Sequence, residues 1–173
     1  MQQEITPAKN WIDALGLLPH PEGGYFRETY RSQEVVPAAG LPARFGAPRA
    51  LATGIYYLLE AGDYSAFHRI KADEMLHFYA GNALDVHMID ERGYSIVTLG
   101  SDVAKGETLQ FTVPAGTWFA AAPKVGAQYS LIGCTVSPGF DFADFEMASG
   151  NDLRGACPSH AQVLIDRFPP RGL

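Results

Sequence analysis

The chain has 173 residues and a mass of 18.8 kDa, which is the size of one domain with a single buried core. Hydrophobic residues make up 47% of the sequence and charged residues 18%, a globular composition that excludes a disordered chain. The formal charge of −6 comes without a basic stripe, so nucleic acid is not an expected partner. Apolar runs such as Ile55 to Leu59 are far shorter than the roughly 20 residues of a membrane-spanning helix. We therefore predict one domain over residues 1–173, with no membrane partner.

The N-terminus and the cysteines indicate the compartment. The segment from Met1 to Glu4 has neither the basic start nor the apolar stretch of a secretory signal, which predicts a cytoplasmic protein. Cys134 and Cys157 are too few to staple a domain of this size and match no CxxC spacing. We expect both to be buried free thiols.

A short helix is expected near the N-terminus. Thr6 can cap free backbone N–H groups, and Pro7 fits the first helical turn, where its missing N–H costs nothing. The apolar residues Trp11, Ile12, Leu15 and Leu18 then fall on one helical face. The pattern predicts a short amphipathic helix that packs on another element.

From Gly23 onward, brief apolar or alternating runs are separated by turn residues, which is typical of an all-β sandwich or barrel. Eight strands of this kind suggest a closed or double-sheet fold. The predicted strands are Gly24 to Tyr30, Leu51 to Glu60, Ser65 to Lys71, Glu74 to Ala80, Ala83 to Asp90, Tyr94 to Leu99, Thr108 to Val113 and Gln128 to Val136.

Two further segments interrupt or end this pattern. Gln33 to Pro48 has three prolines, two glycines and little periodicity, which predicts a long surface loop of the kind that often covers a site. Ala156 to Phe168 is predicted to be a short C-terminal helix, closed by Pro169 and Pro170.

The candidate chemistry is concentrated in residues 62–81. His68, Glu74 and His77 lie there among the apolar residues of two adjacent predicted strands. Imidazoles and carboxylates in such positions can ligate a metal ion or exchange protons. This segment is therefore the first place to look for a site.

The spacing Gly62, His68, Glu74, Gly81 resembles the first motif of the cupin superfamily, and Pro114-Ala115-Gly116 echoes the second. Metal-binding cupins take three His and one Glu, but two of those His positions here hold Ile70 and Phe119. Two protein donors are a poor site for zinc, iron or manganese. We expect no cofactor, and we keep a divalent metal held by His68, Glu74 and His77 as an alternative. Strand alternation places residue 77 on the face opposite residue 74, unless a bulge intervenes.

A fuller resemblance, to the cupin-5 group, covers nearly the whole chain. It implies a cupin double-stranded β-helix, which is a jelly-roll β-sandwich, with short terminal helices, a pocket in the barrel mouth and a homodimer. The strings that carry it are LLPHPEGGYFRETY at 17–30, FHRI at 67–70, DE at 73–74, HFYAG at 77–81, VPAG at 113–116 and GCTVSPGFDFADFE at 133–146.

The segment around His68 is also similar to that of the dTDP-sugar 3,5-epimerases. That resemblance implies His68 as a base that removes a proton next to a ketone, with Glu74 orienting the imidazole. Tyr25, Tyr79 or Tyr129 is then the candidate acid. Arg27 and Arg69 are candidate cations for an enolate or for a sugar-nucleotide phosphate.

The remaining candidate ligand contacts follow from position. The candidates are Glu22 beside a glycine turn, Trp118 as pocket wall, and His77 and Gln110 as hydrogen-bonding groups. Structural roles compete with several of these: His68 bonded to a backbone carbonyl, and Glu74 paired with Arg27. We leave out His20, in a turn flanked by prolines, and His87, on the polar side of an alternating strand, which is expected to face water.

Together these features predict a metal-independent cupin that binds a sugar or sugar nucleotide and catalyses epimerisation or isomerisation, with His68 as base. Two alternatives remain open. One is a non-catalytic small-molecule-binding protein that uses the same pocket, and the other is a metal-dependent cupin enzyme.

Overall fold

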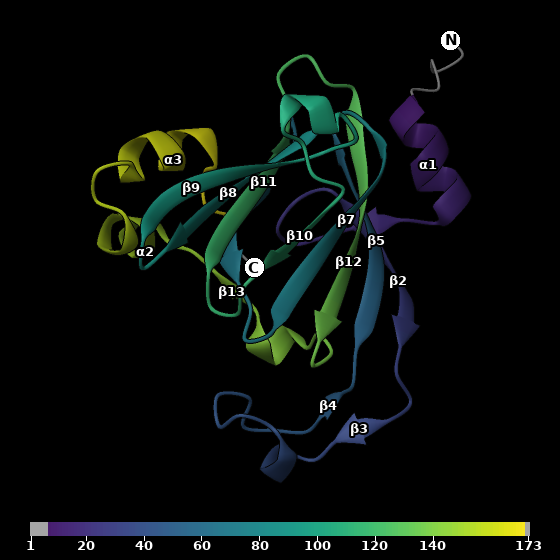
Figure 1. Cartoon of the computed structure of the whole chain (residues 1–173), viewed down its shortest axis with the longest axis vertical. Helices are drawn as coiled ribbons and strands as arrows, with labels where there is room; N and C mark the ends of the chain where they lie inside the picture. Colours follow the sequence, from purple (N-terminus) through teal and green to yellow (C-terminus); the bar gives the residue numbers. More distant parts are fainter. Residues whose placement is uncertain (1–6, 172–173) are drawn as a thin grey trace.

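Two antiparallel sheets face each other in the computed structural model, which describes residues 7–171 (Figure 1). The all-β jelly-roll prediction with short terminal helices is confirmed. The strands are β1 (Leu18–Pro19), β2 (Tyr25–Arg31), β3 (Val35–Val36), β4 (Arg49–Ala50), β5 (Thr53–Glu60), β6 (Ser65–Arg69), β7 (Asp73–Gly81), β8 (Leu84–Asp90), β9 (Gly93–Leu99), β10 (Gln110–Val113), β11 (Trp118–Pro123), β12 (Tyr129–Ser137) and β13 (Glu146–Met147). The helices are α1 (Pro7–Leu15), α2 (Gly150–Ala156) and α3 (Ala161–Arg167), with short 3-10 turns at Ala38–Gly40, Val103–Lys105 and Phe142–Asp144.

The main core lies between the two sheets. One sheet has the strand order β1-β2-β5-β12-β7-β10, and the other has the order β13-β6-β11-β8-β9. Side chains alternate between the two faces of a strand, so Leu84, Val86 and Met88 of β8 point inward and meet Leu76 and Ile132 of the facing sheet. Burial of each large apolar side chain stabilises the fold by about 1.5–3 kcal/mol.

Helices cover the outer face of each sheet (Figure 1). Ala8 and Trp11 of α1 pack on Leu58 and Leu131 of the six-stranded sheet. Thr6, the predicted cap of this helix, lies outside the described residues. No helix between residues 7 and 171 is long and apolar enough to cross a membrane.

The helix pair α2 and α3 encloses a second core on the outer face of the five-stranded sheet, where Leu153, Leu164 and Phe168 contact Ile89 and Trp118. The single predicted helix over residues 156–168 is wrong in extent. Here α2 begins earlier, and a break that contains Pro158 separates it from α3. α2 begins earlier because Ser149 and Asp152 form a capping box there. This sequence signal lies before the predicted segment.

A buried histidine lies inside this second core. His87 of β8 is fully buried, and its ring stacks on Tyr94 and contacts the tilted ring of Phe168, at centroid distances of 6.0 and 4.8 Å. Its Nδ1 lies 2.6 Å from the Tyr94 hydroxyl, whereas its Nε2 has no hydrogen-bond partner within residues 7–171. Burial and the charge of Arg167 lower the pKa of His87 to about 4. The expectation that this side of β8 faces water is wrong, because the C-terminal helices cover it.

One central strand is absent from the sequence-based prediction. β11 pairs with both β6 and β8, and places Phe119 beside His68 and Met88. Its sequence contains three consecutive alanines, which have low β propensity and hide the strand from a propensity argument. Both cysteines are buried free thiols, as predicted.

The segment from Gln33 to Pro48 forms an arm instead of a lid. It carries β3, which pairs with β4, and it extends below the barrel in Figure 1. None of its residues lines the cavity described below. Its contribution is indirect, through Phe45 and the adjoining Arg49, which are both buried.

Candidate active site

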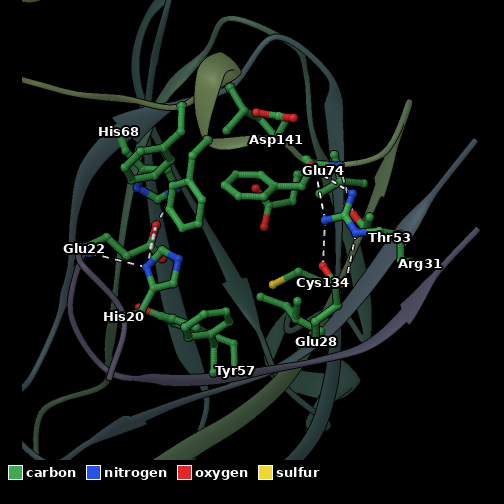
Figure 2. A pocket seen from close by; sticks show the side chains of 17 residues that line it. His20, Glu22, Glu28, Arg31, Thr53, Tyr57, His68, Glu74, Cys134 and Asp141 are labelled. Carbon is green, nitrogen blue, oxygen red and sulfur yellow. Dashed lines mark hydrogen bonds and ion pairs between the residues drawn. The ribbon is translucent and has the colours of Figure 1, made fainter. Parts of the chain in front are cut away.

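A cavity of about 280 Å³ opens at one end of the barrel (Figure 2). Strands β2, β5, β7 and β12 form one wall, β6 and the turn before β2 form the other, and a segment after β12 forms the roof. The lining residues are His20, Glu22, Phe26, Glu28, Arg31, Thr53, Ile55, Tyr57, His68, Ile70, Glu74, Cys134, Val136, Phe140, Asp141, Phe142 and Phe145.

A glycine turn brings His20 and Glu22 into the cavity. Gly23 and Gly24 have φ values of 119° and 66°, a backbone conformation that residues with a side chain rarely adopt. A Cβ atom on Gly23 would collide with the backbone carbonyl of Tyr64, so this turn can approach the segment before β6 only with a glycine here. The Tyr57 hydroxyl donates to the Gly23 carbonyl at 2.7 Å and fixes the turn against β5.

Glu22 connects two imidazoles (Figure 2). Its Oε2 lies 3.2 Å from Nε2 of His68 and 3.6 Å from Nδ1 of His20. Its Oε1 accepts from the Ser65 hydroxyl at 3.0 Å. Glu22, Ser65 and His68 are all buried, so the contacts are shielded from water. The three side chains His20, Glu22 and His68 are called the His20 group below.

The hydrogen bonds assign the protons of this group. Nδ1 of His68 lies 2.8 Å from the Ala66 carbonyl, which only accepts, so Nδ1 carries a hydrogen. One proton is then shared between His68 Nε2 and Glu22 Oε2. Burial raises the pKa of Glu22 and lowers the pKa of His68, which favours a neutral pair with the proton on Glu22. Both ring nitrogens of His68 are therefore occupied.

His20 presents its other nitrogen to the cavity (Figure 2). Its Nδ1 accepts from the Glu22 backbone N–H at 3.3 Å, so Nε2 carries the hydrogen of the neutral ring. Burial lowers the pKa of His20, against the opposing effect of the Glu22 charge. The ring is held edge-on against Phe26, with centroids 4.7 Å apart. His20 is thus a neutral, fixed hydrogen-bond donor.

Glu74 lies on the other side of the cavity, beside Cys134 (Figure 2). Burial raises the pKa of Glu74 to about 7, with a smaller opposing effect from His68. Within residues 7–171, Glu74 has no ion-pair partner. A carboxyl group of this kind changes protonation state near neutral pH.

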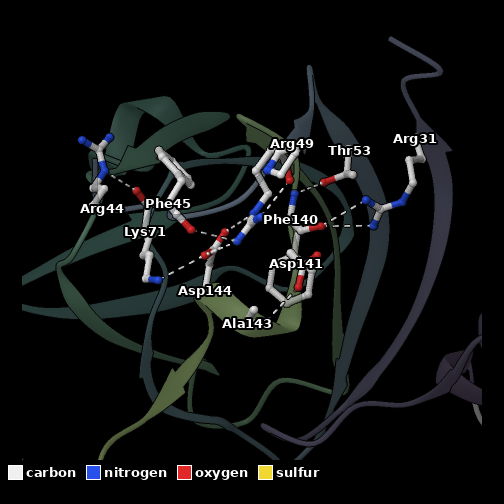
Figure 3. Close-up of polar contacts among 11 residues, drawn as sticks. Arg31, Arg44, Phe45, Arg49, Thr53, Lys71, Phe140, Asp141, Ala143 and Asp144 are labelled. Carbon is white, nitrogen blue, oxygen red and sulfur yellow. Dashed lines mark hydrogen bonds and ion pairs between the residues drawn. The ribbon is translucent and has the colours of Figure 1, made fainter. Parts of the chain in front are cut away.

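The roof contains three aromatic residues, Phe140, Phe142 and Phe145, which contact one another at centroid distances of 5.0–6.1 Å. Polar bonds hold it in place (Figure 3). The backbone of Phe140 donates to Thr53 Oγ1 at 2.9 Å and accepts from Arg31 at 3.1 Å.

The stronger anchor of the roof is a buried ion pair. Arg49 donates two hydrogen bonds to Asp144, at 2.6 and 2.7 Å (Figure 3). The exposed fractions of these residues are 5% and 6%. Burial opposes ionisation of Asp144, but the bonds and charge of Arg49 prevail and lower its pKa. The arm thus secures the roof through Arg49.

Three of the residues predicted for the site are brought together in the cavity, namely Glu22, His68 and Glu74. The predicted partnership of His68 with Glu74 is replaced by a contact with Glu22. The alternative pair between Glu74 and Arg27 is not formed, since Arg27 is exposed and donates to the Leu15 carbonyl at 2.8 Å.

The other predicted ligand contacts lie elsewhere. His77 and Gln110 bond to each other at 2.9 Å on the outer face of the six-stranded sheet, where Tyr79 also lies. Tyr25 and Tyr129 pack under α1, and Tyr129 accepts from Trp11 Nε1 at 3.0 Å. Trp118 lies in the second core beneath Arg69, 4.2 Å from its guanidinium carbon. None of these candidate ligand contacts lines the cavity, and none of the three tyrosines proposed as alternatives for the acid reaches it. Strand alternation and the helices over each outer face explain these placements.

Several cavity residues are not among those predicted. His20 is left out of the predicted site because prolines flank it, although it lies two residues before Glu22. Tyr57 points to the same inward face of β5 as Ile55. The alternation of side chains along this strand is the sequence signal that could have identified it. The sequence pattern from Pro138 to Phe142 favours packing or dimer contacts for its aromatic residues, and only the chain path after β12 places Phe140 and Phe142 over the cavity.

The donor set does not fit a metal ion. Between residues 7 and 171, no group of three or more His, Cys, Asp or Glu side chains is arranged to hold one. The two missing donor positions are filled by Ile70 on the cavity wall and by Phe119, which lies 4.1 Å from the His68 ring by centroid distance. His77, the conditional third ligand, points to the opposite face. We therefore derive no step that involves a metal.

A two-sheet jelly roll with a cavity in its mouth is the architecture of cupins, as of some other double-sheet proteins. The family model described as "Cupin superfamily (DUF985)", Cupin_5, matches residues 9–148. The chain therefore belongs to the Cupin_5 family.

Three relatives support this assignment. The uncharacterized protein YML079W of Saccharomyces cerevisiae is 31% identical over 163 residues, which is 88% of this chain and 80% of the yeast protein. The solved structure of protein SO0799 from Shewanella oneidensis is 40% identical, covers 97% of this chain and 98% of its own, and has a TM-score of 0.79. The structure of a hypothetical protein from Leishmania major is 36% identical, covers 93% of this chain and 97% of its own, and has a TM-score of 0.80.

Proposed function

We propose that this cupin binds a small carbonyl compound and moves a proton on it, as an isomerase or epimerase does. The observation that carries the proposal is the pairing, across one cavity, of a carboxyl group without a cation and an imidazole N–H that faces it. Glu74 and His20 are these two groups. Proton abstraction next to a carbonyl needs a base at the carbon and a donor at the oxygen.

Glu74 is the proposed base. Its carboxylate form takes the proton from the carbon next to the carbonyl. Return of the proton to the former carbonyl carbon isomerises the compound, and return to the opposite face of the same carbon epimerises it. A pKa of about 7 suits this task, because a useful fraction is ionised at neutral pH while the group still binds a proton well. The base role predicted for His68 passes to Glu74, since both His68 nitrogens are occupied.

His20 is the proposed donor to the carbonyl oxygen. As the enolate forms, negative charge develops on that oxygen, and the neutral Nε2–H stabilises it. Glu22 and His68 act as positioning residues. The backbone N–H of Glu22 holds His20, and Glu22 and His68 retain one buried proton between them.

Deuterium exchange tests the proposal. The protein is incubated in D₂O with a panel of aldoses, ketoses and cyclic ketones, and deuterium uptake at carbon is followed by NMR. We expect exchange with at least one compound, rising as the pH increases through about 7 because the carboxylate is the active form. Glu74→Gln is expected to lower the rate at least about 100-fold, within the range of general-base catalysis.

The matched control is His77→Gln, which changes a histidine on the outer face of the same strand. Its exchange rate should equal that of the unmodified protein. Binding without any exchange would contradict the proposal and leave a non-catalytic small-molecule-binding protein.

We also propose that the protein is a homodimer. The outer face around His77 exposes apolar side chains, with exposed fractions of 39% for Met75, 52% for Tyr79 and 51% for Leu109. Light scattering coupled to size exclusion should give twice the chain mass of 18.8 kDa. Tyr79→Asp should shift the protein toward the monomer, and a monomer at micromolar concentration without any substitution would contradict this prediction.

A further inference from the structure

The charges of the cavity are unbalanced toward the negative. Glu22, Glu28, Glu74 and Asp141 all line it, whereas Arg31 is the one cationic lining residue in the described part of the chain. Glu22 is neutralised by the proton that it shares with His68. The cavity therefore has one cation, Arg31, which is already paired. Its carboxyl groups Glu74 and Asp141 form no ion pair with any residue between 7 and 171.

Arg31 is not available to a ligand anion. Its Nε and Nη2 donate to the two carboxylate oxygens of Glu28, at 3.0 and 2.7 Å. Its Nη1 and Nη2 also donate to the Phe140 carbonyl, both at 3.1 Å (Figure 3). A ligand phosphate would have to displace these bonds. The guanidinium therefore binds Glu28 and the roof instead of presenting a free charge.

The other cations near this end of the barrel are also engaged. Arg49 and Lys71 contact Asp144, the latter at 3.4 Å. Arg69 donates to Glu146 at 2.7 Å, and Arg44 donates to the Lys71 carbonyl at 2.7 Å. None of these four side chains lines the cavity. An anionic group inside would thus meet carboxyl groups without a compensating positive charge.

The size of the cavity is also fixed. Its volume of about 280 Å³ lies at the small end of ligand sites. The roof cannot lift freely, because Arg49, Arg31 and Thr53 bond to Asp144 and Phe140. Phe26, Tyr57 and the roof phenylalanines present flat apolar surfaces between these anchors.

From this charge balance and these walls, we infer that the ligand is a compact, flat compound that carries no negative charge, and that phosphate esters and nucleotide sugars are excluded. The inference rests on the proposed function, of which it specifies the substrate class. The proposed substrates are therefore unphosphorylated carbonyl compounds, and sugar nucleotides are not among them.

Three probes of one shape and different charge test it. Benzamide, benzoate and benzamidinium share a flat ring with a planar head group. Their affinities are measured by calorimetric titration at pH 8, where Glu74 is mostly ionised. We expect benzamide and benzamidinium to bind, and benzoate to bind at least about tenfold more weakly than benzamide, because a second negative charge enters a poorly hydrated site.

Glu74→Gln keeps the shape of the side chain and removes its charge, so the difference between benzamide and benzoate should shrink to less than about threefold. Asp141→Asn at the mouth gives a second, independent reduction if the first variant folds poorly. Glu146→Gln, which removes an exposed carboxylate outside the cavity, is the control and should leave the tenfold difference unchanged.

Benzoate binding as tight as benzamide binding would overturn the inference, as would tight binding of a sugar phosphate or a nucleotide sugar. Failure of benzamide and benzamidinium to bind at millimolar concentration would also overturn it. The deuterium-exchange experiment is read separately. Loss of exchange with the expected affinity order would refute the proton-transfer function alone, and exchange on a phosphorylated substrate would refute this inference alone.

Discussion

Replacing Arg49 by Met is expected to lower the free energy of unfolding by about 3–5 kcal/mol. The substitution leaves Asp144 buried and charged without its two hydrogen bonds of 2.6 and 2.7 Å. Lys71 is the one other cation that contacts it in the described chain, at 3.4 Å from a half-exposed position, and it cannot replace a bidentate partner. Urea denaturation followed by tryptophan fluorescence measures the change.

The matched control is Arg69→Met, which breaks an ion pair of similar length with Glu146 on the surface. That pair is partly exposed, so its loss should cost at most about 1 kcal/mol beyond the packing of Arg69 on Trp118. Equal effects of the two substitutions would show that the buried pair does not hold the roof.

Acidification is expected to destabilise the protein through His87. The pKa of this histidine is about 4 in the folded protein against 6.5 when unfolded, so the unfolded chain binds more protons between these values. The free energy of unfolding is therefore highest above about pH 6.5. It falls by roughly 2–3 kcal/mol from this one group as the pH decreases toward 4. The positive Arg167 opposes protonation of His87, Asp85 favours it, and Tyr94 already occupies its Nδ1.

The measurement compares unfolding free energies at pH 7 and pH 4.5 for the unmodified protein and for His87→Gln. The variant should be less stable at pH 7 but should lose less stability on acidification, because its side chain does not titrate. His77→Gln, on an exposed face, should retain the full pH dependence. An identical pH dependence in His87→Gln would assign the acid sensitivity to other groups.

The fold is largely predictable from the sequence, because alternation of apolar residues fixes which face of a strand is buried. The spacing of Gly62, His68, Glu74 and Gly81 is enough to place two cavity residues on adjacent strands, and these strands lie in facing sheets. β11 escapes such reasoning because its three alanines carry little strand preference. Tertiary pairing with β6 and β8 decides its conformation.

The site is predictable only in part. Alternation can say that Glu74 and His77 point to opposite faces, but it cannot say which face meets a cavity. His20, Tyr57 and Phe142 are far apart along the chain, and only the path of the turn before β2 and of the roof brings them together. The partner of His68 depends on that same path, because the distant Glu22 takes the place of the nearby Glu74.

The way the cavity is assembled has a consequence for folding order. Ser65 and Glu22 are separated by 43 positions, and Arg49 and Asp144 by 95. Each contact closes a long loop, and the loop entropy is lost before the contact contributes any stability. Folds dominated by such distant contacts form slowly. The shortest continuous fragment that holds the His20 group, Glu74 and the roof together runs from residue 20 to residue 145, so competence to bind arises only when the last of these loops has closed.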